Sequence, residues 1–214
     1  MTPDEQLLQA WRSGDKRAGN ELFQRYFETV RRFFANKVDD DLEDLVQRTF
    51  IACVEGQQRF EGRSEFRSYL LGIARHLLWK HWEARRTRGR PEPIDELSVT
   101  DLGAGPSSLF ARSQDERRLL DALRRIPLRD QLVLEFYYWE ELSGSELGEV
   151  LGVSEETARS RLRRAKLALG KELRRLERFA GVPESTDDDI EQWARRVRDQ
   201  GLEGKGVDVR GDAN

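Results

Sequence analysis

The sequence has very few of the residues that build disulfides and metal centres. Its 214 residues include one cysteine, Cys53, and two histidines, His76 and His81. A lone cysteine cannot form an internal disulfide, and these three side chains are too few for the common structural zinc sites. We therefore expect no bound metal and no cofactor.

Long apolar runs are also missing. No stretch of about 18 apolar residues occurs, as a membrane-spanning helix would need, and the opening residues MTPDEQLLQAWRSGDK lack the basic-then-apolar order of a signal peptide. This pattern predicts a cytoplasmic protein without membrane insertion. With 37% hydrophobic and 36% charged residues, the chain is expected to bury one or two small cores.

The charged residues lie in blocks, although the formal net charge is only −3. Residues 39–55 hold six acidic side chains and one arginine, and residues 184–214 are also acidic overall. Residues 75–90 hold six basic side chains and one glutamate, whereas residues 154–178 hold nine basic and four acidic ones. Two basic blocks indicate contact with a polyanion at two separate places.

Apolar residues recur at intervals of three and four, which is the spacing of amphipathic helices. Helices are predicted over residues 4–38, with a break at Ser-Gly-Asp, and over 41–56, 65–86, 114–125, 129–140, 144–151 and 155–178. Residues 87–113 contain three prolines and three glycines, which oppose a regular helix. The predicted fold is all-α, with two small helical domains (1–90 and 114–180), a flexible linker (91–113) and an acidic extension (181–214).

The second domain carries the pattern of a helix-turn-helix. Ser143 and Glu146 have capping-box spacing, Gly152 is placed to end that helix, and Ser154 is placed to cap the next one. Two helices joined by about three residues, the second of them basic, are typical of this motif. A solvated basic helix is the alternative interpretation.

At 100° per residue, the two sides of this last helix differ in chemistry. Ala158, Leu162, Ala165 and Leu169 share the inner side. The outer side and its flanks carry the residues that we predict to contact DNA: Thr157, Arg159, Ser160, Arg163, Arg164 and Lys166. Arg163 or Arg164 is expected to read a base, whereas Arg159 and Lys166 are expected to bind phosphate.

The helix over residues 65–86 is predicted to expose Arg75, Trp79, Trp82 and Arg86 on one face. Rings interleaved with guanidinium groups suit single-stranded nucleic acid, because bases stack on the rings while arginines hold phosphates. The alternative is that both tryptophans pack beneath the linker or the N-terminal helix.

The acidic helix over residues 41–55 places Leu42, Val46, Thr49 and Cys53 on its inner side, so Cys53 is interpreted as a core residue. Its outer side carries Asp44, Gln47, Arg48 and Ile51. A mixed polar and apolar face with carboxylates favours a protein partner over DNA, and an ordinary solvated face is the alternative.

Three segments in this order carry a resemblance to a known family. They are DLEDLVQRTFIACV, FRSYLLGIARHLLWKHWEARR and LLDALRRIPLRDQLVLEFYYWEELSGSELGEVLGVSEETARSRLRRAKLAL. Together they resemble the bacterial sigma-70 family, specifically its short extracytoplasmic-function type, over about residues 4–178.

The resemblance implies a specificity subunit of RNA polymerase with no enzymatic activity or small-molecule substrate. It implies that Asp44 and Gln47 bind the β′ clamp helices of core polymerase, with Arg48 and Ile51 beside them, and that the second domain meets the β flap. The melted −10 element would be read by Arg75, Trp79, Trp82 and Arg86, with Arg63 and Ser64 in the preceding loop. The second domain would bind the −35 element, and an anti-sigma factor is customary in this family.

Two other classes of protein remain as alternatives at this point. A conventional helix-turn-helix regulator would bind DNA without polymerase, usually as a dimer on paired half-sites. An enzyme acting on nucleic acid would need clustered catalytic groups, which the sequence does not show.

The extension is predicted to contain a short helix with Ile190, Trp193 and Val197 on one side. A helix of this length needs a surface to dock on. We expect it either to cover a DNA-binding face as a built-in restraint or to bind a separate regulator.

Overall fold

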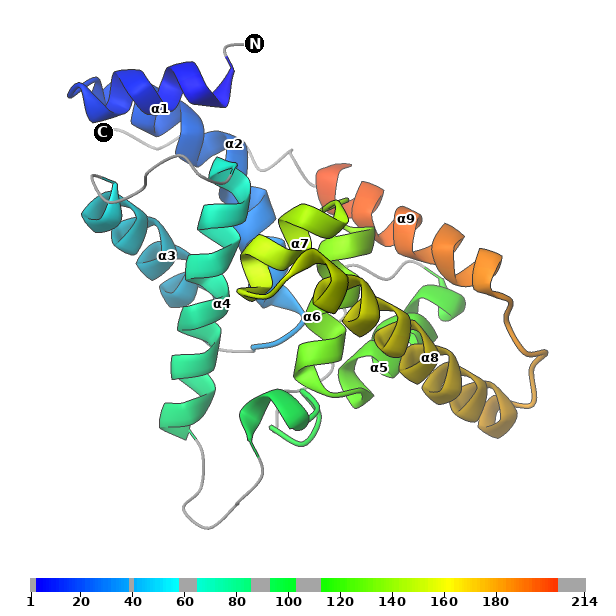
Figure 1. Ribbon diagram of the computed structural model, residues 1–214. Coiled ribbons are helices and arrows are strands. Elements are labelled where there is room, and N and C mark those ends of the chain that lie inside the picture. Colours follow the sequence, from blue (N-terminus) through cyan, green and yellow to red (C-terminus); the bar gives the residue numbers. More distant parts are fainter. Residues whose placement is uncertain (1–2, 39–40, 58–64, 86–92, 103–112, 204–214) are drawn as a thin grey trace, which may run out of the picture.

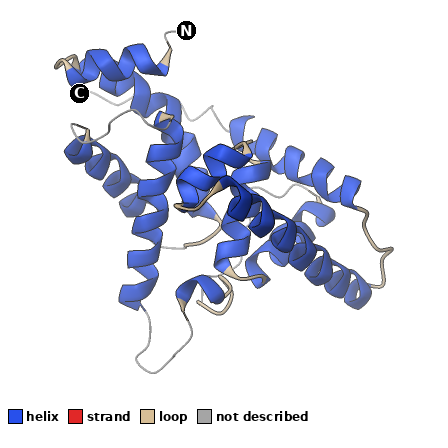
Figure 2. Ribbon diagram, in the orientation of Figure 1, coloured by secondary structure: helices blue, strands red, loops and turns tan. Residues whose placement is uncertain are grey.

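The computed structural model describes residues 3–38, 41–57, 65–85, 93–102 and 113–203. Within these ranges the chain forms nine α-helices, one short 3-10 helix and no strand. Figures 1 and 2 show the helices as two groups that pack against each other, with the last helix lying along the second group. The prediction of an all-α fold is confirmed.

The first domain contains four helices, and the predicted break after the first helix is confirmed. Asp15 ends the break, because its side chain accepts hydrogen bonds from the backbone N–H groups of Arg17 and Ala18 and so caps the following helix. Gly14 has φ +102°, in the left-handed region that favours glycine. The helices are α1 (Asp4–Arg12), α2 (Lys16–Ala35), α3 (Leu42–Gly56) and α4 (Phe66–Arg85).

The core of the first domain lies where α2, α3 and α4 meet. Its fully buried side chains include Leu22, Val30, Phe34, Leu45 and Cys53. Burial raises the pKa of the Cys53 thiol to about 12, so the thiol stays protonated at neutral pH. The interpretation of Cys53 as a core residue is confirmed.

The second domain begins within the predicted linker. Residues 93–102 form η1 (Ile94–Glu96) and then pack against α6, with the Leu128 backbone N–H donating to the Leu97 carbonyl at 2.8 Å. Ile94 and Val99 are buried. This part of the predicted flexible linker is therefore packed, because its apolar side chains find a place in the core. The helices that follow are α5 (Gln114–Arg125), α6 (Leu128–Tyr138), α7 (Gly144–Leu151) and α8 (Glu155–Ala180).

The predicted helix-end signals are present in the second domain. Ser143 and Glu146 form a reciprocal capping box on α7, and the Ser154 side chain accepts a hydrogen bond from the Thr157 backbone N–H at the start of α8. Gly152 ends α7 with φ +68°, a left-handed conformation. The capping box at Ser113 and Glu116 was not predicted.

The two domains meet through buried ion pairs between the C-terminal end of α2 and that of α6, including the residues just after each helix. Arg32 bonds to Glu140 at 2.6 Å. Lys37, which is fully buried just after α2, pairs with Glu135. Burial lowers the pKa of Lys37, and the carboxylate of Glu135 opposes that shift. A buried ion pair of this kind holds the two segments together, because removing one partner while the other stays buried leaves a charge with neither a counter-ion nor water around it.

Around these pairs lie apolar contacts and several buried polar groups, not all of which have a hydrogen-bond partner among the described residues. The rings of Phe33 and Phe136 stack with centroids 5.8 Å apart, and Arg124 donates to the Asn36 carbonyl at 3.3 Å. The Asn36 side-chain amide and the Oε1 atom of Gln131 are buried, with no hydrogen-bond partner among the described residues. Unpaired buried polar groups cost free energy, so this interface is less favourable than an apolar one of equal size.

The extension forms the predicted helix, α9 (Asp187–Glu203). Its residues Ile190, Trp193 and Ala194 are buried. It contacts α5 and α6 of the second domain and also α2 of the first, and Figure 1 shows the loop that joins it to the end of α8. The helix therefore touches both domains.

Replacing Glu135 with alanine is expected to separate the domains without unfolding them. Leaving Lys37 buried without its counter-ion would cost about 3–5 kcal/mol, and opening the interface avoids that cost by returning the ammonium group to water. Small-angle scattering should show a larger radius of gyration, with unchanged helix content by circular dichroism.

The matched control is Lys37→Met combined with Glu135→Leu, which removes both charges and should keep the protein compact. An unchanged radius of gyration for Glu135→Ala alone would contradict the role given to this ion pair.

Candidate nucleic-acid interface

The helix-turn-helix places α8 across α7, as the sequence predicts. Ala158, Ala165 and Leu169 are buried against the domain, and Leu162 is half-buried. Gly148 allows the turn between the helices to lie close to α7, because a Cβ atom there would lie 2.8 Å from the Val153 carbonyl oxygen. The small residues set the distance between the helices and so fix which side of α8 faces outward.

The outward side of α8 matches the predicted DNA-contacting face for most residues. Thr157, Arg159, Ser160, Arg163 and Arg164 are all exposed. Part of this face forms a groove of about 410 Å³, which is lined by Arg159, Leu162, Arg163, Lys166, Leu167, Gly170, Arg174 and Asp187. A basic groove along an exposed helix can accept phosphate groups.

Arg164 is held differently from Arg163. Its guanidinium lies 3.7 Å from Asp130 of α6, a carboxylate whose side chain is only 4% exposed. Burial raises the pKa of Asp130, and the nearby Arg164 opposes that rise. Arg164 therefore compensates a buried acid in its own domain, which leaves Arg163 as the better candidate to read a base.

Lys166 is half-buried and already has partners. Its ammonium group lies 4.5 Å from the centre of the Tyr137 ring, 5.2 Å from that of Tyr138, and 3.7 Å from the Glu191 carboxylate of α9. The sequence predicted a solvent-facing phosphate contact. The difference arises because α9 and the two tyrosines cover this flank of the helix.

The predicted face of α4 is only partly exposed. Arg75 and Trp79 lie together, with the guanidinium 5.1 Å from the ring centroid, and Arg75 also donates to the Val150 carbonyl of α7 at 3.3 Å. Arg63, Ser64 and Arg86 lie outside the described residues. The structure therefore brings Arg75 and Trp79 together, directly beside the second domain.

The predicted exposure of Trp82 is wrong. This side chain is 4% exposed, and its Nε1 atom is buried without a hydrogen-bond partner among the described residues. Ser68 and Leu71 of the same helix are buried too. The reason is that α4 packs on α2 and α3 and also on α7 and η1, so a helix in contact with neighbours on several sides has little solvated surface.

The outer face of α3 is exposed as predicted. Asp44, Gln47, Arg48 and Ile51 are all exposed, and Arg48 bonds to Asp44 at 3.3 Å. Gln47 and Ile51 line a groove of about 630 Å³ between α2 and α3, together with Asn20, Phe23, Gln24, Phe27, Glu43, Val46, Phe50 and Val54. We call this the α2/α3 groove.

The aromatic side of the α2/α3 groove was missed by the sequence analysis. Phe27 is 40% exposed and Val54 is 48% exposed, and the rings of Phe27 and Phe50 stack with centroids 6.3 Å apart. The signal in the sequence was that Phe23, Tyr26 and Phe27 make the apolar stripe of α2 wider than one buried face needs. Exposed aromatic rings of this kind mark a binding surface.

The described residues carry no candidate metal centre. In these ranges no three histidine, cysteine or acidic side chains are grouped to hold a metal ion. None of the described helices has both the length and the apolar character needed to cross a membrane.

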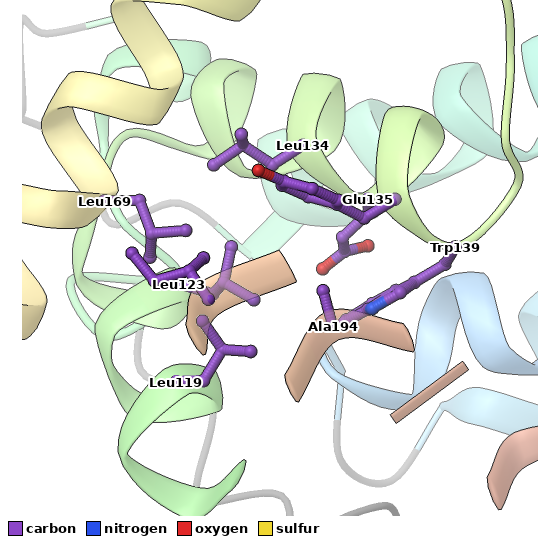
Figure 3. Close-up of a pocket in the computed structure, with 9 residues that line it drawn as sticks. Leu119, Leu123, Leu134, Glu135, Trp139, Leu169 and Ala194 are labelled. Carbon is purple, nitrogen blue, oxygen red and sulfur yellow. The ribbon is translucent and has the colours of Figure 1, made fainter. Parts of the chain in front are cut away.

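The cavity among α5, α6, α8 and α9 measures about 10 Å³, and Figure 3 shows Ala194 and the Trp139 ring on its wall. It is barely large enough for one water molecule.

Comparisons with known proteins match both domains. A family model described as Sigma-70 region 2 matches residues 22–89, and one described as Sigma-70, region 4 matches residues 116–169. The ECF RNA polymerase sigma-E factor of Haemophilus influenzae is 27% identical over 172 residues, which cover 76% of this chain and 91% of that protein. The ECF RNA polymerase sigma factor BldN of Streptomyces coelicolor is 27% identical over 154 residues, or 70% of this chain and 58% of that protein.

A solved structure shares the fold. The structure of CnrH in complex with the cytosolic domain of CnrY has a TM-score of 0.56 and 21% sequence identity, and the match covers 79% of this chain and 96% of that chain. The fold and the exposed basic helix define a two-domain helical protein with a helix-turn-helix. The chain belongs to the sigma-70 family of RNA polymerase sigma factors, in its extracytoplasmic-function group.

The two tryptophans of α4 are expected to respond differently to replacement. Trp82→Ala removes a buried ring and should lower the free energy of unfolding by about 3–5 kcal/mol. Trp79→Ala removes a half-buried ring and should cost about 1 kcal/mol. Urea denaturation followed by circular dichroism measures both, and equal losses would contradict the burial difference.

Proposed function

We propose that this sigma factor binds core RNA polymerase through the α2/α3 groove and reads promoter DNA through α4 and α8. The observation that carries the proposal is the presence of both family regions on domains that expose an aromatic groove and a basic recognition helix. In this proposal the protein acts in the cytoplasm as a transcription factor without an active site or cofactor.

The α2/α3 groove suits a helical protein partner. Phe27, Ile51 and Val54 are exposed apolar anchors, and Asp44 and Glu43 add negative charge at the edge, where DNA would be repelled. The β′ clamp helices of core polymerase are the partner that the family resemblance implies. The apolar anchors provide affinity and the acidic edge orients the partner.

Promoter recognition is divided between the two domains. The exposed arginines of α8 bind the −35 element as duplex, while Arg75 and Trp79 on α4 contact the opened −10 element. The described structure packs α4 against α7, with Arg75 bonded to the Val150 carbonyl. The domains therefore separate when both elements are bound.

Other proteins compete for these surfaces in the proposal. The solved structures of CnrH and of RpoE from Bartonella quintana are complexes, the first with the cytosolic domain of CnrY and the second with the anti-sigma factor NepR. We extend an anti-sigma partner to this chain, together with the β flap of core polymerase as the partner of the second domain.

Replacing Asp44 and Gln47 together with alanine is expected to weaken binding to core polymerase by about tenfold or more, equivalent to about 1.4 kcal/mol. Both side chains are exposed, so the free energy of unfolding should change by less than about 0.5 kcal/mol. Surface plasmon resonance with immobilised core enzyme measures the affinity.

The matched control is Glu55→Ala, an exposed acidic position at the C-terminal end of α3, about three turns from Asp44. Unchanged affinity of the double variant, or an equal loss in the control, would contradict the assignment of the groove.

Arg163→Ala is expected to relax the base preference at one position of the −35 element, at a cost of about 1–3 kcal/mol for the preferred base. Arg164→Ala should instead lower the thermal stability of the second domain, because Asp130 loses a compensating charge. Binding to a panel of single-base promoter variants and thermal unfolding separate the two effects. The control is Lys171→Ala, which changes an exposed basic position farther along α8. If Arg163→Ala instead weakens binding to every promoter variant equally, Arg163 does not read a base.

The decisive test of the function is run-off transcription with core polymerase and a library of genomic fragments. The proposal expects transcripts that start downstream of one shared pair of promoter elements. Tight, specific DNA binding without polymerase and without transcripts would instead indicate a conventional regulator.

A further inference from the structure

The extension helix α9 is attached to the rest of the protein by specific contacts just before its first residue and along its length. Before the helix, the buried carboxylate of Glu177 accepts hydrogen bonds from the backbone N–H and the hydroxyl of Ser185. Thr186 then caps α9, with reciprocal bonds to Asp189. Farther along, Arg196 bonds to Glu116 at 3.3 Å. A segment fixed in this way has one defined docked position.

The docked position fills an apolar groove on the second domain. Ile190 and Ala194 line a small cavity with mostly apolar side chains from α5, α6, α8 and the residue after α6, namely Leu119, Leu123, Leu134, Tyr138, Trp139 and Leu169, together with Glu135. Trp193 is only 8% exposed. Because only a cavity of about 10 Å³ is left between α9 and these residues, the fit is close, and Figure 3 shows Ala194 directly beside Trp139. Without α9, these apolar side chains would face water.

The acidic start of α9 lies at the recognition helix. Glu191 is 3.7 Å from Lys166, and Asp187 lines the basic groove with Arg159, Arg163 and Lys166. Asp187 in this groove and Glu191 beside Lys166 place negative charge where phosphate groups would bind, and so they repel DNA. The same docking that buries Ile190 therefore withholds Lys166 from DNA.

The helix also spans the interface between the domains. It contacts α2 as well as α5 and α6, beside the Lys37–Glu135 and Arg32–Glu140 pairs that hold α2 to α6. Contacts with both domains favour their closed arrangement, because they are all made at once only when the domains are together.

We propose that α9 is an internal ligand that competes with DNA: its docking in the apolar groove of the second domain masks Lys166 and keeps the two domains closed. Its release exposes the basic groove and frees the apolar groove for an amphipathic helix of a partner. The effect on DNA affinity is independent of the proposed function, whereas the effect on transcription rests on it.

The first test uses the full-length protein with Ile190→Ser and Trp193→Ser together. Hydrogen exchange over residues 187–203 should rise, which shows that α9 is undocked. Affinity for a short mixed-sequence DNA duplex should increase about fivefold or more, at the lower end of typical coupling between sites. The plot of log affinity against log salt should steepen by about one unit as Lys166 becomes available.

A synthetic peptide of residues 183–203, added in excess, should return the affinity of this variant towards that of the unchanged protein. The same peptide with Trp193→Ser should have no effect. Faster exchange with unchanged or weaker DNA binding would overturn the proposal, because α9 would then be a structural cap or a part of the DNA-binding surface.

A second full-length variant tests the masking of Lys166 even if the first variant does not fold. Glu191→Gln keeps the apolar docking but removes the partner of Lys166, so the salt dependence should steepen while hydrogen exchange stays the same. Asp188→Asn removes one exposed acid from the first turn of the same helix and is the matched control. Equal salt slopes for both variants would overturn the masking of Lys166.

The two proposals can fail separately. If core polymerase gives no transcripts with any variant but the undocked protein still gains DNA affinity, the proposed function fails and the internal ligand stands. If transcription from a fragment library is normal and DNA affinity does not respond to undocking, the proposed function stands and the internal ligand fails.

Discussion

The buried pair of Lys37 and Glu135 is the contact on which the arrangement of the two domains depends. Lys37 is fully buried at the end of α2, where an ammonium group without a partner would be strongly disfavoured. Glu135 is the group that makes this position tolerable, and it belongs to the other domain. The first domain therefore has a polar requirement that is met only while the second domain is in place.

An ionic interface of this kind combines specificity with reversibility. A buried ion pair adds little net stability compared with apolar packing, but it strongly disfavours arrangements in which only one partner is buried. The side-chain amide of Asn36 and the Oε1 atom of Gln131, which have no hydrogen-bond partner among the described residues, reduce the favourable free energy further. Because all of these groups are well solvated once exposed, the domains can separate at moderate cost, as a protein that reads two promoter elements requires.

The burial of the recognition surfaces follows from the same arrangement. Closing the domains brings α7 onto α4, so Arg75 meets the Val150 carbonyl instead of solvent. The α2/α3 groove lies away from these contacts and stays open, with Phe27 and Ile51 partly exposed. In the proposed function, the closed protein thus presents the α2/α3 groove to core polymerase while the Arg75 and Trp79 face of α4 is partly covered, which orders the two binding events.

Sequence alone determined the features that depend on near neighbours in the chain. Helix positions, the caps at Ser143 and Ser154, and the buried side of α8 follow from periodicities and spacings of a few residues. The exposed faces of α3 and α8 were predictable for the same reason. Only the tertiary structure decided what covers a helix on its second side. Trp82 is buried because α4 has neighbours beyond α2 and α3, Lys166 is half-buried because α9 reaches it, and Lys37 meets Glu135 across 98 positions of sequence. A helical period identifies one buried side, whereas contacts between distant segments depend on packing that no local pattern encodes.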